Sequence, residues 1–129
     1  MIQSAATETH AAGKLPKFAV FLLLRATTQW LSLSRVERRA AAETHLGSAL
    51  EKLPALSIRH FDTEAFSAEC SDIMLVETSD LEQYHDFIEM LRDSPLVTAP
   101  YFEFVRIVPS IEDGFRSFEE RTHAQAGTA

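Results

Sequence analysis

The stretch from Lys17 to Arg25 limits the possible folds more than any other part of the sequence. Its central residues, 18–24, read Phe-Ala-Val-Phe-Leu-Leu-Leu and contain no polar side chain. Because successive side chains of a strand point to opposite faces of a sheet, both faces would be apolar here. The stretch therefore predicts a central strand over residues 18–26 that leaves neither face for water.

The pattern along the rest of the chain alternates strands with helices. Four strands are predicted in all, over residues 18–26, 56–62, 73–78 and 101–108. Two long helices and a shorter third are predicted over residues 34–52, 79–93 and 111–121.

Sequence signals mark the ends of several of these elements. Ser34 with Glu37 fits a capping box, and Ser79 with Glu82 fits a second one. Pro109 is expected to close the fourth strand, because proline lacks the N–H that a ladder needs.

The order βαββαβ is that of a ferredoxin-like α+β sandwich. Its first and third strands are central, and these are the two most apolar runs here. Its helices cover one face only, so about 400 Å² of a second apolar face left in water would forgo about 10 kcal/mol. The simplest cover is the same face of a second copy, which gives a dimeric α+β barrel. The alternative cover is the C-terminal segment around Phe115 and Phe118.

A chain of 129 residues suffices for one domain with its own core. We expect a single ferredoxin-like domain over residues 15–121. Residues 1–14, small and polar without periodicity, are expected to form a disordered leader, and residues 122–129 a frayed tail.

Composition excludes several classes of partner. The net charge of −7 disfavours nucleic acid. The apolar run stops at Arg25, too short for a membrane span and without a signal-peptide cleavage site. Cys70, the only cysteine, rules out an internal disulfide and suits the cytoplasm. With four glycines and no phosphate-binding loop, no cofactor is predicted.

Several short strings in combination resemble the darcynin family, small bacterial proteins without an established activity. They are Phe21-Leu22-Leu23-Leu24, Ala26-Thr27, Trp30-Leu31, residues 61–68, Cys70-Ser71-Asp72, residues 91–95, residues 100–103 and residues 111–115. The resemblance covers roughly residues 17–120. It implies one intact domain and transfers no catalytic residue.

His60, Asp62 and Glu64 occupy alternate positions, so an extended strand would place them on one side. An imidazole with carboxylates can hold a divalent metal. The alternative, which we favour, is that the strand ends near Asp62 and these residues face water, so no metal site is predicted.

Arg25 and Glu77 end the two central strands. Together with His60 or Arg106 they could ring the mouth of a cavity and orient a small polar ligand. The alternative, favoured here, is a structural ion pair at the edge of the core. The ligand-binding candidates are Arg25, His60, Asp62, Glu77 and Arg106, and no catalytic residue is assigned.

The sequence favours a homodimer, paired through its sheet face, that binds a small organic ligand or regulates another process. A second hypothesis is a cofactor-independent enzyme, since dimeric α+β barrels include small monooxygenases and isomerases; this is analogy of fold alone. A third is a protein-interaction module that uses acidic helix faces.

Overall fold

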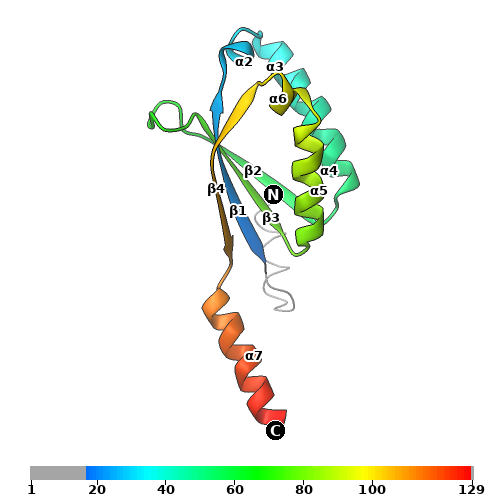
Figure 1. The fold of residues 1–129 in the computed structure, drawn as a ribbon, viewed down its shortest axis with the longest axis vertical. Coiled ribbons are helices and arrows are strands. Elements are labelled where there is room, and N and C mark those ends of the chain that lie inside the picture. Colours follow the sequence, from blue (N-terminus) through cyan, green and yellow to red (C-terminus); the bar gives the residue numbers. More distant parts are fainter. Residues whose placement is uncertain (1–16, 129) are drawn as a thin grey trace.

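A four-stranded antiparallel sheet forms the centre of the computed structural model, which describes residues 17–128 (Figure 1). Its strands are β1 (Phe18–Ala26), β2 (Leu56–Asp62), β3 (Asp72–Thr78) and β4 (Phe102–Ile111). They lie in the order β2-β3-β1-β4, so the two most apolar strands are central. The ferredoxin-like βαββαβ prediction is confirmed. The expected leader, residues 1–14, lies outside the described residues.

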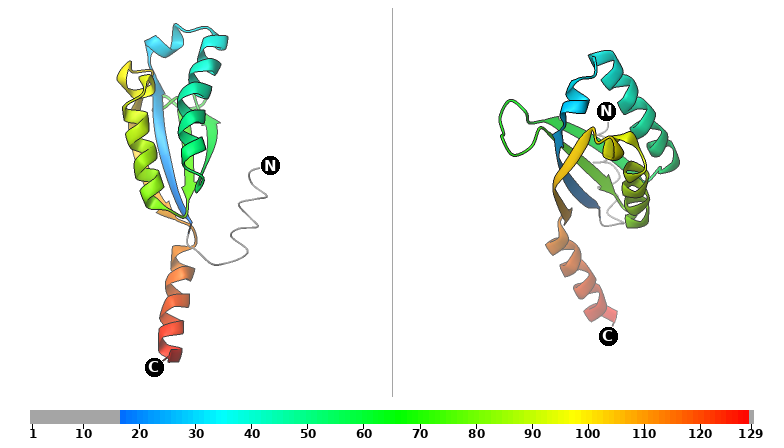
Figure 2. Two further views of the ribbon diagram at one scale, coloured as in Figure 1. Left: turned by 90° about the vertical axis from the view of Figure 1, so that its right-hand side faces the viewer. Right: turned by 45° about the horizontal axis from the view of Figure 1, so that its top comes forward.

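The helices of the two connections lie together on one face of the sheet (Figure 2). The first connection contains α2 (Thr28–Leu31), α3 (Arg35–Ala42), the π-helical turn η1 (Glu43–Gly47) and α4 (Ser48–Lys52). The second contains α5 (Leu81–Arg92) and α6 (Pro95–Thr98), and α7 (Gly114–Thr128) follows β4. The predicted helix over residues 34–52 is therefore present, but a π turn interrupts it.

One of the two predicted capping boxes forms. The Ser34 hydroxyl accepts from the Glu37 amide at 3.1 Å, and the Glu37 carboxylate accepts from the Ser34 amide at 2.7 Å. The predicted cap at Ser79 is wrong by one residue. Asp80 caps α5 instead, because its carboxylate accepts from two amides and also favours the positive end of the helix dipole.

The core lies between the sheet and these helices. The helix-facing positions of β1 and β3 are almost fully buried, and so are apolar residues of α4 to α6. These core residues include Val20, Leu22, Leu24, Met74, Val76, Phe87, Leu91 and Leu96. Helix α5 packs into this core through Phe87, whose side chain is fully buried.

The fourth strand passes through Pro109 and ends at Ile111, so the prediction that Pro109 closes it is wrong. Pro109 pairs with Val20, and β4 is an edge strand. An edge strand tolerates proline because one side of its backbone needs no ladder partner. The β1–β4 register also shifts between Leu23 and Leu24, which marks a bulge.

The other face of the sheet carries no helix within residues 17–128. Its central side chains are apolar, from Phe21 and Leu23 on β1 to Ile73 and Leu75 on β3. Figure 1 shows α7 running away from the end of β4, so the C-terminal segment does not cover this face.

Helix α7 continues to Thr128, past the end expected at Arg121. Residues such as Ala124 and Gln125 have favourable helix propensity, so the expected frayed tail continues the helix. The side chains of Phe115 and Phe118 are 77% and 60% exposed. Most of this aromatic surface is thus left uncovered by the rest of residues 17–128.

Candidate functional site

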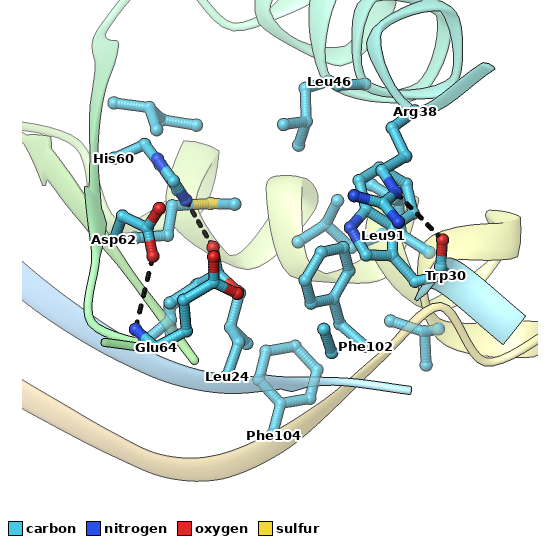
Figure 3. A pocket seen from close by; sticks show the side chains of 18 of the residues that line it. Leu24, Trp30, Arg38, Leu46, His60, Asp62, Glu64, Leu91, Phe102 and Phe104 are labelled. Atoms are coloured by element: carbon cyan, nitrogen blue, oxygen red, sulfur yellow. Dashed lines mark hydrogen bonds and ion pairs between the residues drawn. The ribbon is translucent and has the colours of Figure 1, made fainter. Parts of the chain in front are cut away.

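A pocket of about 720 Å³ lies on the helix-covered side of the sheet. Its floor and inner wall are apolar, and Figure 3 shows Leu24, Phe102 and Phe104 in the lower part of the view, Leu91 above them and Leu46 at the top. The volume falls within the range of about 300–1,000 Å³ that is typical of sites for small organic molecules. The pocket can therefore enclose an apolar ligand of moderate size.

A histidine–aspartate pair lies at one side of the pocket. The Nε2 atom of His60 is 2.7 Å from Oδ1 of Asp72, and the Ser71 hydroxyl donates to the other carboxylate oxygen of Asp72 at 2.6 Å. His60 on β2 pairs with Met74 on β3, two positions from Asp72, so both side chains share the helix-facing side. The His60 side chain is 57% exposed, against 17% for Asp72.

The pair shifts the protonation of both groups. The hydrogen bond to Asp72 raises the pKa of His60, and the negative charges of Asp72 and Asp62 add to this against a smaller opposing effect of burial. Burial alone would raise the pKa of Asp72, but hydrogen bonds from His60 and Ser71 together lower it. His60 therefore keeps its proton to higher pH than a free imidazole.

Three arginines of α3 line the pocket opposite this pair: Arg35, Arg38 and Arg39. Arg38 is engaged in the fold, because its guanidinium donates to the carbonyl of Trp30 at 3.2 Å and to that of Leu31 at 2.8 Å. Arg35 and Arg39 are exposed and make no ion pair with another described residue. The pocket thus has two available cations on one wall.

The π turn η1 forms part of the same wall. Ala42, which precedes it, and Leu46 within it both line the pocket. The wider turn rotates the helix between these two residues, and single π turns occur frequently at functional sites. No residue in 43–47 is an obvious sequence signal for this turn.

The structure places two of the five predicted ligand-binding residues, His60 and Asp62, at this pocket. The other three belong to the open face of the sheet. Arg25 donates to the carbonyl of Glu69 at 2.7 Å, and Arg106 pairs with the Glu69 carboxylate at 2.9 Å. Through Glu69, both arginines therefore hold the loop between β2 and β3 against the sheet.

Glu77 lies at the opposite end of the sheet from Arg25. The antiparallel register sets Glu77 beside Ala19, whereas Arg25 follows Leu24, the partner of Asp72. Glu77 instead pairs with Lys17 at 3.6 Å and with Arg59 at 3.3 Å. The expectation that Arg25 and Glu77 share a cavity mouth or form an ion pair is wrong, because antiparallel strands end at opposite edges.

Among residues 17–128, no three His, Cys, Asp or Glu side chains are arranged to hold a metal ion. His60, Asp62 and Glu64 therefore do not form the metal site considered from their spacing. In the same part of the chain, no helix has the length and hydropathy to cross a membrane.

Sequence reasoning missed Asp72 and the arginines of α3. Asp72 begins a strand after a long loop, and nothing in its neighbours indicates that it meets His60. The arginines lie in the run Arg35-Val36-Glu37-Arg38-Arg39, whose mixed charges are typical of a solvated helix face. Only the folded arrangement brings these residues to one pocket.

Sequence comparison finds a family that matches nearly the whole chain. A family model described as "Darcynin, domain of unknown function" matches residues 3–127, a wider range than the resemblance noted from the sequence. A Chromobacterium violaceum protein named Darcynin is 52% identical over 68 residues, 53% of this chain and 86% of that protein. Darcynin 1 of Acinetobacter baumannii is 43% identical over 89 residues, 69% of this chain and 99% of that protein.

Solved structures with the same fold include chlorite dismutases. One from Candidatus Nitrospira defluvii superposes with a TM-score of 0.66 at 17% identity, over 84% of this chain and 44% of that chain. A dimeric one from Nitrobacter winogradskyi gives 0.56 at 20% identity, over 74% of this chain and 55% of that chain. The present chain thus spans only about half of those proteins, and the likeness shows the fold alone.

Proposed function

The chain belongs to the darcynin family, and on that premise we propose that it is a homodimeric domain that binds a small organic anion. The observation that carries the binding proposal is the pocket of about 720 Å³ with an apolar floor and charged groups at its sides. Largely apolar pockets with a few convergent polar groups are the usual form of small-molecule sites.

The charge distribution around the pocket supports an anionic ligand. Arg35 and Arg39 project from α3 without ion-pair partners among the described residues. A carboxylate or sulfonate would pair with these guanidinium groups, which match planar oxyanions well. The apolar body of the ligand would then pack against Leu24, Phe102 and Phe104.

The open face of the sheet supports the homodimer. Phe21 and Leu23 pair across the sheet with Leu75 and Ile73, so four apolar side chains adjoin at its centre. Val108 on the edge strand extends this face and is 45% exposed. Two copies of such a face can cover each other about a twofold axis, because the same patch serves both partners.

A ligand-binding experiment tests the proposal directly. The anionic dye 1-anilinonaphthalene-8-sulfonate (ANS) should bind the full chain, with one ANS per protomer observed by native mass spectrometry. The same spectra should give the mass of a dimer at micromolar concentration. Absence of saturable ANS binding would refute the binding role, and a monomer alone would refute the dimer.

Catalysis without a cofactor is the second candidate function. The His60–Asp72 pair favours it, because a hydrogen-bonded imidazole at a pocket is a common acid–base arrangement. We place the protein in the cytoplasm, where the thiol of Cys70 would stay reduced.

A further inference from the structure

We infer that the His60–Asp72 pair makes the pocket a proton-transfer site for a carbonyl compound that carries an anionic group and an apolar body. The inference rests on the proposed binding function and names the reaction performed at the same site. It comes from one spatial fact: the imidazole lines the cavity, and a carboxylate fixed by a second residue holds it there.

The hydrogen bonds determine which imidazole nitrogen is available. Nε2 of His60 lies 2.7 Å from the Asp72 carboxylate, so in the neutral ring the proton belongs on Nε2. Nδ1 then carries the lone pair, and it has no hydrogen-bond partner among the described residues. Asp72 is itself held by the Ser71 hydroxyl at 2.6 Å. Asp72 is thus a positioning residue, and His60 is the group that meets the substrate.

The step requires no oxidant and no cofactor. Nδ1 of His60 takes a proton from the carbon next to a carbonyl group, and the C–H electron pair forms a C=C bond while the carbonyl oxygen becomes an enolate. The imidazolium then returns its proton to oxygen or carbon, which completes a tautomerisation. An aromatic 2-oxo acid such as phenylpyruvate contains all the required parts: an aryl ring, a carboxylate and an acidic C–H.

Charged groups from each neighbouring element surround the imidazole. Asp62 of β2 and Glu64 of the following loop lie on its side of the pocket, and Asp72 of β3 contacts it directly. The charges of Asp72 and Asp62 favour imidazolium. Arg35, Arg38 and Arg39 of α3 lie on the facing wall, where positive charge favours the enolate. The base and the anion-binding groups are therefore on opposite sides of one cavity.

Proton NMR in D₂O tests the inference with phenylpyruvate as the probe. The full chain should accelerate exchange of the C3 protons over the buffer rate. His60→Gln should lower the protein-dependent rate at least about 10²-fold, the usual minimum contribution of a general base. His85→Gln, on the outer surface of α5, should leave the rate unchanged. Saturation-transfer NMR on the same samples should show that His60→Gln still binds phenylpyruvate.

The pH profile separates a positioning role of Asp72 from a structural one. Asp72→Asn should shift the apparent pKa of the exchange rate downward, because the neutral amide no longer favours imidazolium. In the wild-type protein, the apparent pKa of exchange should equal the pKa of His60 measured by NMR titration, a comparison that needs no variant. Phenylpyruvate binding without accelerated exchange, or a mismatch of these two pKa values, would overturn the inference and leave the binding function standing. Absence of saturable ANS binding to the wild-type chain would overturn both the inference and the binding function.

Discussion

The imidazole of His60 and the carboxylate of Asp72 meet at 2.7 Å, although they come from two strands that a long loop separates. The β2–β3 register produces this contact, because His60 lies opposite Met74 and Asp62 lies opposite Asp72. The pair is therefore fixed by strand pairing and not by the loop. Because β2 is an edge strand, this contact links the stability of the sheet edge to the protonation of His60 in the pocket.

We expect the pair to stabilise the fold only in a window of pH. The pKa of His60 is raised above 6.5, so its contribution is complete below pH 6.5 and is lost as pH rises through the folded value. The pKa of Asp72 is lowered below 3.8, so its contribution is present above pH 3.8 and is lost as pH falls through the folded value. Asp72→Asn should therefore cost most between these limits, by at most about 1 kcal/mol for a half-exposed pair.

Thermal unfolding of wild type and Asp72→Asn across pH 3–9 measures this window. His85→Gln is the matched control, because His85 and Asp86 are both exposed and 3.6 Å apart. A stability difference between wild type and Asp72→Asn that did not change with pH would contradict the assignment.

We expect Ala42→Phe to block the pocket. Ala42 lines the cavity just before the π turn, so a phenyl ring there would fill space that a ligand needs. ANS affinity should fall roughly tenfold or more, equivalent to at least about 1.4 kcal/mol. Ala40→Phe, on the exposed side of the same helix, should bind ANS like wild type. Equal affinity of both variants for ANS, measured by fluorescence titration, would show that ANS does not bind in this pocket.

The sequence predicted the sheet because hydrophobic periodicity reports burial directly. Two strands with apolar residues on both faces had to be central, and β1 and β3 are. A local signal failed where tertiary context decides, because Pro109 lies within a strand only since β4 is an edge. The cap of α5 was predicted one residue early for a local reason: Ser79 and Asp80 are both favourable N-cap residues, and the Asp80 carboxylate accepts from the helix amides.

The site was less predictable than the fold. His60 and Asp62 were identified, because alternate positions of a strand place an imidazole and a carboxylate on one side. Asp72, Arg35 and Arg39 have ordinary sequence surroundings, and only the register of β2 on β3 and the position of α3 bring them together. Arg25 and Glu77 were paired in error because adjacency of two strands was predicted without their relative direction.

If the open face of the sheet is the dimer interface, one charge added to that face should dissociate the dimer. Val108 and Ile107 are neighbours on β4 with 45% and 46% exposure, and they pair with Phe21 and Leu22 respectively. Their side chains therefore point to opposite faces. Val108→Glu would bury a carboxylate in the interface of each copy, which costs several kcal/mol without a partner.

Sedimentation analysis at micromolar concentration distinguishes the two substitutions. Val108→Glu should sediment as a monomer, whereas Ile107→Glu should remain a dimer with the same net charge. Dissociation of both variants alike, or of neither, would place the contact elsewhere, and a monomeric wild type would refute the interface.

Arg38 and Arg39 should separate stability from binding, although they are adjacent on α3. The Arg38 guanidinium donates to two carbonyl oxygens at the end of α2, so Arg38→Ala should cost about 1–3 kcal/mol. It should also alter the fluorescence of Trp30, the only tryptophan, whose ring lies 4.8 Å from that of Phe102.

Arg39→Ala loses no such bond, so its stability should stay within about 0.5 kcal/mol of wild type. Its affinity for ANS should fall, and more so at low salt, because an exposed guanidinium attracts an anion less once ions screen it. Denaturant unfolding and ANS titration of the two variants check this, and the prediction is contradicted if Arg39→Ala unfolds earlier than Arg38→Ala or binds ANS as tightly as wild type.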